Sequence, residues 1–212
     1  MNRLALIGSR DFAKQIRTHA EKTGEYRVVG FFDDFAAEGS LVDGLPILGG
    51  LDSVDVLFAK SMFDCLFFAA GYNNFTFRDN AFTRFKGRIP FANIIMPSCS
   101  IGDNVTLGEG IFLGDYNEVG DNTTIEDNVF VHGRTIIGHD NHIGAHSYIS
   151  GRFDSAGFVS MGKRNFYGIR TCISDHVFIC DDVWIGLGCI VGKDIKEPGK
   201  YMSACVKLYK IE

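Results

Sequence analysis

The chain has 212 residues, of which 46% are apolar and 22% charged, a composition typical of a globular protein with room for one large domain or two small ones. Its formal net charge is −5 and its Lys and Arg residues are dispersed, which argues against a nucleic-acid partner. No apolar run approaches the ~20 residues of a membrane span, and the six cysteines include no Cys-x-x-Cys pair. We therefore expect a soluble cytoplasmic protein with free thiols.

Residues 1–94 alternate between strand and helix patterns. LALIG near the start is an apolar run without a cleavage site after it, typical of a first strand and not of a signal peptide. RDFAKQIRTHAEKTG has helical spacing and ends on a glycine, and YRVVGFFDD follows as a second strand. A third strand pattern, DCLFFAAG, precedes another helical one, TFRDNAFTRFK. This rhythm predicts a Rossmann-like domain with a small parallel sheet over residues 1–94.

From Ile95 onward the chain follows a six-residue repeat. Written in sixes, 17 hexapeptides run without a gap to residue 196, with Ile, Leu or Val first in 14 of them and Gly second in 10. A period of six fits neither a helix nor a plain strand. It fits a parallel β-helix, in which each hexapeptide gives one short strand and one corner and its aliphatic residue points inward. We predict this fold for residues 95–212, since an all-β sandwich would need loops that break the register.

The carboxyl end of the predicted sheet gathers residues suited to a nucleotide. A glycine ends the first strand directly before a helix, where backbone amides and the helix dipole favour an anion. Two aspartates end the second strand, where a carboxylate can accept ribose hydroxyls. A full G-x-G-x-x-G motif is absent, so a mononucleotide pocket and a plain surface turn both remain open. The candidate residues are Gly8, Ser9, Arg10, Asp33, Asp34, Gly71 and Asn73.

Three of the six histidines, His139, His142 and His146, lie within eight residues of one another. They occupy the third, sixth and fourth positions of their hexapeptides, so they leave the coil in different directions. A metal ion needs convergent ligands. We therefore predict no metal site within one chain, and expect His142 and His146, like His132 and His176, at the surface or an interface.

His139 lies at a corner of the predicted coil. With three hexapeptides per coil, Gly157 stacks beside it on the next coil. Because glycine has no side chain, a histidine beside it predicts a slot through which a thin ligand can approach backbone amides. The alternative is that His139 and Gly157 are ordinary turn residues. One full coil is atypical, because Ser155, Met161 and Tyr167 replace inward aliphatic residues. Its core is either repacked around these residues or distorted around a ligand.

The gapless hexapeptides, preceded by LALIGSRDF, FFDD and AAGYNN, resemble one family over the whole chain. It comprises bacterial sugar acetyltransferases that join a nucleotide-binding α/β domain to a left-handed β-helix. Its members include bacillosamine-pathway, perosamine and viosamine N-acetyltransferases and sialic acid O-acetyltransferases. The resemblance implies a homotrimer that binds acetyl-CoA, its co-substrate, along the β-helix between neighbouring subunits, without a metal.

The resemblance also implies roles for individual residues. The family uses a histidine followed by an acidic residue as its base, and GHD at 138–140 assigns these roles to His139 and Asp140. This chain departs from the family at two places. It reads GSRDFAK where the family has several glycines. It also has Tyr148 where the family often has a histidine that contacts the acetyl carbonyl, and the tyrosine hydroxyl can still donate a hydrogen bond. The residues implied to line the coenzyme are Tyr148, Ser150, Gly157 and Ile169.

The implied reaction is acetyl transfer from acetyl-CoA to the amine of a nucleotide-linked amino-deoxy sugar, such as a dTDP-, UDP- or GDP-4-amino-4,6-dideoxyhexose, for surface polysaccharide synthesis. O-acetylation of a sialic acid is the alternative within the same class. A β-helix carbonic anhydrase with zinc on histidines of neighbouring subunits and a non-catalytic trimeric scaffold are alternatives of other classes. A nucleotide pocket has no use in a carbonic anhydrase, which argues against that alternative.

Overall fold

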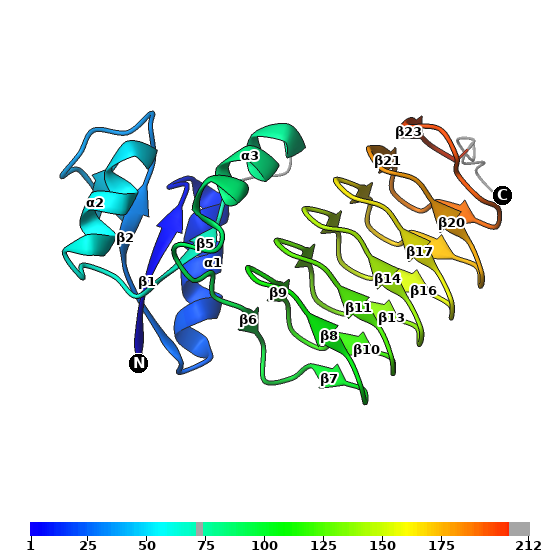
Figure 1. Cartoon of the computed structure of the whole chain (residues 1–212). Coiled ribbons are helices and arrows are strands. Elements are labelled where there is room, and N and C mark those ends of the chain that lie inside the picture. Colours follow the sequence, from blue (N-terminus) through cyan, green and yellow to red (C-terminus); the bar gives the residue numbers. More distant parts are fainter. Residues whose placement is uncertain (71–73, 204–212) are drawn as a thin grey trace, which may run out of the picture.

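The computed structural model describes residues 1–70 and 74–203, and consists of a small α/β unit followed by a long coil of short strands (Figure 1). The strands of the α/β unit are β1 (Asn2–Ile7), β2 (Tyr26–Phe32), β3 (Leu41–Val42), β4 (Leu45–Gly49) and β5 (Cys65–Phe68). They form one sheet in the order β3-β4-β2-β1-β5, parallel throughout except for the β3–β4 pair. The predicted Rossmann-like α/β architecture is confirmed.

The helices of this unit are α1 (Asp11–Lys22), the 3-10 helix η1 (Leu51–Ser53), α2 (Val54–Ala59) and α3 (Phe75–Phe85). Helix α1 buries Ala13, Ile16 and Ala20, whose spacing of three and four residues forms one apolar face. Asn74 precedes α3, and its side-chain oxygen accepts a hydrogen bond from the Phe77 amide at 2.9 Å, which caps the helix. Helix α1 packs against strands β1 and β2 of the sheet.

The repeat region forms three parallel sheets that enclose a core, as the period of six predicted. Sheet I comprises β7 (Ser100–Ile101), β10 (Glu118–Val119), β13 (Ile136–Ile137), β16 (Asp154–Ser155), β19 (Cys172–Ile173) and β22 (Ile190–Val191). Sheet II comprises β8 (Thr106–Leu107), β11 (Thr124–Ile125), β14 (His142–Ile143), β17 (Ser160–Met161) and β20 (Phe178–Ile179). Sheet III comprises β6 (Ile94–Ile95), β9 (Phe112–Leu113), β12 (Phe130–Val131), β15 (Tyr148–Ile149), β18 (Phe166–Tyr167), β21 (Val183–Ile185) and β23 (Gly199–Tyr201).

Corners join these sheets along three edges of a prism. Edge I/II holds residues 102–105, 120–123, 138–141, 156–159 and 174–177. Edge II/III holds residues 108–111, 126–129, 144–147, 162–165 and 180–182. Edge III/I holds residues 96–99, 114–117, 132–135, 150–153, 168–171 and 186–189. In a three-sided prism each edge lies opposite one sheet, so edge I/II lies opposite sheet III.

The fourth residue of each hexapeptide makes the corner. From Asn104 to Asp182, every non-glycine residue at this position has φ between 55° and 64°. Few side chains other than Asn and Asp adopt this left-handed conformation readily. Buried first-position side chains stack in register from coil to coil, as Val119, Ile137 and Ser155 do, and this packing holds the corners in place.

The atypical coil keeps this register. Ser155, Met161 and Tyr167 are buried and pair with their neighbours 18 residues away. The Tyr167 hydroxyl accepts a hydrogen bond from Asn165 Nδ2 at 3.1 Å, and Ser155 Oγ accepts one from Asn141 Nδ2 at 2.7 Å. Of the two interpretations of this coil, the structure therefore supports a repacked core.

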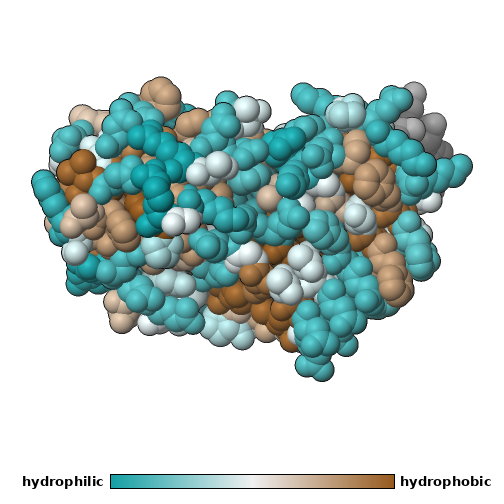
Figure 2. Space-filling model, viewed as in Figure 1, coloured by the Kyte–Doolittle hydropathy of each residue, from teal (hydrophilic) through white to brown (hydrophobic). Residues whose placement is uncertain are grey.

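The α/β unit packs on sheet III. Four outward side chains of that sheet, Phe112, Phe130, Tyr148 and Phe166, stack on one another and share one buried cluster with apolar residues of the α/β unit. Phe12 of α1 lies on this stack, 4.8 Å from Phe130 between ring centres. Figure 2 shows that hydrophobic side chains also appear in patches over the coils, within a largely hydrophilic surface.

Extended backbone carries the chain between the two units. Leu66 of β5 exchanges hydrogen bonds with Pro90 and Ala92, at 2.9 and 2.8 Å, and β6 at Ile94–Ile95 then opens the first coil. Among the described residues, no helix is long and apolar enough to cross a bilayer.

Candidate functional site

A cavity of about 690 Å³ opens at the carboxyl ends of β1, β2 and β5. Gly8, at the end of β1, has a φ of 103°, and a Cβ atom there would lie 3.0 to 3.1 Å from the backbone of Ala69 and Ala70. Only glycine fits this conformation and this close approach. The cavity is lined by five of the predicted nucleotide-site residues, which are Gly8, Ser9, Arg10, Asp33 and Asp34.

The two aspartates hold the walls of this cavity together. Asp33 Oδ2 accepts hydrogen bonds from Ser9 Oγ at 2.5 Å and from the Ser9 amide at 3.1 Å. Asp34 Oδ1 accepts one from the Leu51 amide at 2.7 Å. The end of β2 is thereby tied to the turn after β1 and to η1. Gly71 and Asn73, also predicted for this site, lie outside the described residues.

The phosphate-binding potential of this turn is reduced by its sequence. Arg10 precedes α1 and makes no side-chain cap, and Asp11 places a carboxylate in the first turn of the helix. The Asp11 carboxylate lies at the positive end of the helix dipole, where a bound anion would lie, and pairs with Lys14 at 3.1 Å. An anion bound here would need the Ser9 region or the Arg10 guanidinium as well.

His139 and Asp140 lie on edge I/II and contact each other. The distance between His139 Nδ1 and Asp140 Oδ2 is 2.8 Å, and the His139 side chain is 57% exposed. Asp140 has a φ of 55°, which folds its carboxylate back beside the preceding ring. The corner thus brings together two adjacent side chains that would diverge in a strand.

Gly157 lies directly beneath the His139 ring, as the 18-residue coil predicted. A Cβ atom at Gly157 would lie 2.6 Å from Cε1 and 2.7 Å from Nε2 of that ring. The predicted open slot is wrong, because the imidazole itself fills the space. Within the part of the chain that the structure describes, the Gly157 amide donates no hydrogen bond.

Phe158 completes the surroundings of His139. Its ring meets the His139 ring edge-on at 5.1 Å and stacks on His176 at 4.8 Å. His176 in turn lies 3.1 Å from Asp175. Edge I/II therefore carries two histidine–aspartate pairs separated by one exposed aromatic ring, and the sequence singled out only the first.

The remaining predicted coenzyme residues lie elsewhere on the coil. Tyr148 is only 4% exposed, on sheet III, and its hydroxyl lies 2.5 Å from His132 Nε2. Because sheet III lies opposite edge I/II, Tyr148 does not meet a ligand held by His139 of the same chain. Ser150 and Ile169 lie on edge III/I, so sheet I separates them from His139.

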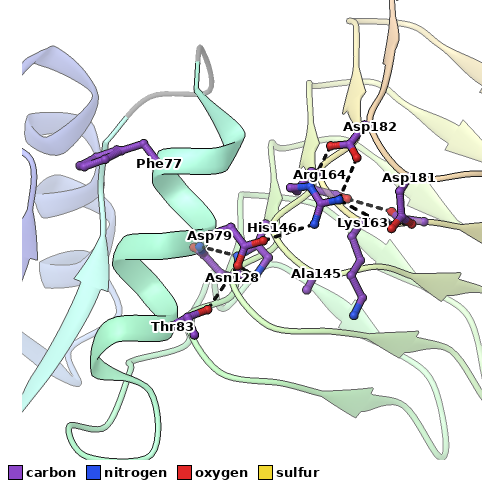
Figure 3. A network of polar contacts seen from close by, with 12 residues as sticks. Phe77, Asp79, Thr83, Asn128, Ala145, His146, Lys163, Arg164, Asp181 and Asp182 are labelled. Carbon is purple, nitrogen blue, oxygen red and sulfur yellow. Dashed lines mark hydrogen bonds and ion pairs between the residues drawn. The ribbon is translucent and has the colours of Figure 1, made fainter. Parts of the chain in front are cut away.

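His146, expected at the surface or an interface, is buried beneath α3 of its own chain (Figure 3). Its Nε2 lies 3.2 Å from Asp79 Oδ1 and its Nδ1 lies 3.0 Å from Asn128 Nδ2. Burial lowers the pKa of His146 to about 4, so the ring is neutral near pH 7. Arg164 pairs with both Asp79 and Asp182, which joins α3 to edge II/III. The repeat pattern places His146 at a corner but gives no sign that a helix covers it.

His132 also departs from the expected surface position. It is half-buried in a cavity of about 360 Å³ between α1 and edge III/I, where burial lowers its pKa to about 4. Neither of these histidines belongs to a metal-binding cluster. In residues 1–70 and 74–203, no three His, Cys, Asp or Glu side chains converge in a way that could hold a metal ion.

Solved structures resemble nearly the whole chain. A variant of perosamine N-acetyltransferase from Caulobacter crescentus, solved with CoA and GDP-perosamine, superposes with a TM-score of 0.84 over 96% of this chain and 94% of that one, at 25% identity. The acetyltransferase domain of PglB from Neisseria gonorrhoeae FA1090 superposes with a TM-score of 0.80 over 96% of this chain and 97% of that one. At 22% identity, this second likeness shows a shared fold. The left-handed β-helix is thereby confirmed.

Two segments also match described families. Residues 3–85 match the PglD N-terminal domain, and residues 118–151 match the bacterial transferase hexapeptide, six repeats. A segment similar to the PglD N-terminal domain is therefore followed by a segment similar to the hexapeptide repeats. Its curated relatives include UDP-3-O-acylglucosamine N-acyltransferase from Herminiimonas arsenicoxydans, 42% identical over 65 residues that make up 31% of this chain. The match spans only about a fifth of that relative, 19% of its length.

Proposed function

We propose that this protein transfers an acetyl group from acetyl-CoA to the amino group of a nucleotide-linked amino-deoxy sugar, in the cytoplasm, for surface glycan synthesis. The observation that carries the proposal is the His139–Asp140 pair beside the Gly157 amide, which has no acceptor among the described residues, on a fold shared with a perosamine N-acetyltransferase. That relative was solved with CoA and GDP-perosamine, which are the two classes of ligand that the proposal requires.

The geometry of the pair suits a general base. With its hydrogen on Nδ1, the His139 ring donates to Asp140 at 2.8 Å and leaves the Nε2 lone pair free to take a proton. In the proposed reaction, the sugar amine forms a C–N bond to the thioester carbonyl while Nε2 accepts the amine proton. The C–S bond then breaks, and the proton passes to the coenzyme thiolate.

We assign the negative charge of the tetrahedral intermediate to the Gly157 amide. A backbone N–H without an internal acceptor, fixed in a rigid corner, can stabilise an oxyanion without reorganising. Phe158 places an apolar ring beside the imidazole, edge-on at 5.1 Å between ring centres. Tyr148 is buried under the α/β unit of its own chain and takes no part in this site.

The nucleotide of the sugar is proposed to bind in the cavity beside Gly8, Ser9 and Asp33. This cavity belongs to the unit that packs on sheet III, whereas His139 lies on the opposite edge. A second copy can bring its cavity to the first copy's His139, which supports the homotrimer that the resemblance implies. Exposed apolar side chains on the coil, including Ile136, Ile169, Leu187 and Ile190, offer surface for such an interface.

Release of coenzyme A with amino sugars, compared with hydroxyl sugars, tests the proposal. Turnover only with a nucleotide-linked amine supports it, and turnover only with a sialic acid hydroxyl replaces it with O-acetylation. No turnover with either, in a protein that stays trimeric, would favour a scaffold. A zinc assay of the purified protein tests the carbonic anhydrase alternative separately.

A further inference from the structure

Three exposed arginines form a row on edge III/I. Arg134, Arg152 and Arg170 occupy the fourth position of three successive corners, and the Arg152 and Arg170 amides each donate to the preceding coil at 3.3 Å. Neighbouring coils lie about 4.8 Å apart. This arginine row thus lines up three positive charges on a chain whose formal net charge is −5. Like charges on neighbouring corners repel one another unless an anion lies between them.

The carboxylates of residues 1–70 and 74–203 do not neutralise the arginine row. No carboxylate oxygen among the described residues lies within 4.0 Å of these three guanidinium groups. Arg134 instead lies over the Tyr116 ring, 5.3 Å from its centre. By contrast Arg164, at the same position on edge II/III, contacts three carboxylates, from Asp79, Asp181 and Asp182.

The backbone beside the arginine row carries an amide donor that no other described residue accepts from. On edge II/III, the third-position amide of Glu109 donates to the Asp127 side chain of the next coil at 2.9 Å. On edge III/I, Gly133 and Gly151 occupy the corresponding positions, and the Gly133 amide donates no hydrogen bond within the described residues. A Cβ atom at Gly151 would meet only Gly133 O at 3.2 Å and His132 Cβ at 3.7 Å. The place that a carboxylate fills on one edge is therefore open on the other.

We propose that the arginine row and the Gly133 amide bind a phosphate or diphosphate group at the place that Gly151 leaves open. Guanidinium groups bind phosphate through paired hydrogen bonds, and exposed backbone amides add further donors. Two ligands of the proposed reaction carry such a group. Because the cavity of the α/β unit already accounts for the nucleotide, we assign the site to the diphosphate of coenzyme A, and this assignment rests on the proposed function.

A substitution that supplies the missing carboxylate tests the site. Gly151→Asp imitates Asp127 and should compete with the anion for the Gly133 amide, whereas Gly151→Asn has nearly the same size and no charge. Titration calorimetry with pyrophosphate and with coenzyme A should show at least a tenfold loss of affinity for the aspartate variant. The asparagine variant should lose much less.

Removing the arginines gives a second, independent measurement. Asn is well suited to left-handed corners, so Arg152→Asn combined with Arg170→Asn should fold at least as stably as the wild type. Loss of charged hydrogen bonds typically costs about 10 to 100-fold in affinity. We expect a loss of that size for pyrophosphate and coenzyme A, with UDP binding unchanged. A loss confined to UDP and pyrophosphate would still support the phosphate site but would give it to the nucleotide sugar.

Unchanged affinity for all three probes overturns the proposal. Dissociation of the trimer in the arginine variant, detected by light scattering, would also overturn the proposal. The arginines would then pair with carboxylates of a neighbouring subunit and not with the anion. A different result would contradict the proposed function, namely that the wild-type protein transfers no acetyl group. A wild type that binds pyrophosphate through the arginine row but releases no coenzyme A would keep this site and remove that function.

Discussion

The His139 ring lies on Gly157, one coil away, while its Nδ1 atom contacts the neighbouring Asp140 at 2.8 Å. Two separate features of the coil fix this ring. The 18-residue stacking places a residue without a side chain beneath it, and the left-handed corner turns the carboxylate toward it. The ring is therefore positioned without being buried, which is the condition that a base acting on an external substrate needs.

Replacing His139 by Ala should lower the rate of acetyl transfer by roughly 10² to 10⁴-fold, the usual effect of losing a positioned base. Stability should change by less than about 0.5 kcal/mol, because the side chain is exposed at a corner. His176→Ala removes the other histidine of the edge and is the matched control. Initial rates and thermal unfolding of both variants decide the matter, and equal losses in both would contradict the assignment to His139.

Gly157→Ala should displace the base without removing it. The new methyl group would lie 2.6 Å from Cε1 of the imidazole, so the exposed ring must move. We expect the rate to fall at least about tenfold, as small misplacements of reacting groups cost this much or more, with little loss of stability. Gly192→Ala is the control, because nothing lies within 4 Å of its added Cβ atom. Full activity of Gly157→Ala would show that the ring's place on the glycine is unimportant.

Asp33→Ala should weaken nucleotide-sugar binding by about 10 to 100-fold, the usual range for hydrogen bonds to a charged group, and leave acetyl-CoA binding intact. Part of this loss is structural, since Asp33 holds Ser9 in the turn at 2.5 Å. Ser9→Ala should therefore show a smaller effect in the same direction. Calorimetric titration of both ligands measures this, and parallel loss of both affinities would contradict two separate pockets.

Stability should fall as the pH drops from about 6.5 to about 4. Burial lowers the pKa values of His132 and His146 to about 4, below the unfolded value near 6.5. In this window the unfolded chain binds more protons than the folded one, so each histidine reduces the unfolding free energy by up to about 1.4 kcal/mol per pH unit. Above the window the effect disappears. Urea unfolding across this range should be flatter for His132→Gln combined with His146→Gln, and an equally steep pH dependence would rule these residues out.

Light scattering should report a trimer of the 23.4 kDa chain. Charged substitutions at two exposed apolar positions of the coil, Ile136→Asp and Ile190→Asp, should dissociate it and abolish transfer together. The exposed Met62→Asp on the α/β unit serves as the control. An active monomer would remove the shared-site mechanism.

The repeat let the sequence predict much of the coil, because a strict period fixes which positions point inward and which residues stack. The contact of His139 with Gly157 followed from counting 18 residues alone. What covers the outside of the coil does not follow from the period. His146 and His132 looked exposed because their positions point outward, yet α3 covers the first and α1 partly covers the second. Likewise Phe112, Phe130, Tyr148 and Phe166 are far apart in the sequence, and only their positions on sheet III bring their rings into one stack.

The left-handed corners have a consequence for how such a chain can change over time. A bulky residue in this conformation costs on the order of 1 kcal/mol relative to Asn or Gly, so random drift should favour the small residues wherever the side chain has no task. Arg152, Phe158 and Arg170 run against that tendency. Replacing each of these residues in turn by Asn would show which of them have a function. A substitution that raises thermal stability without loss of activity marks a residue without a function, and one that raises stability but lowers activity marks a functional residue.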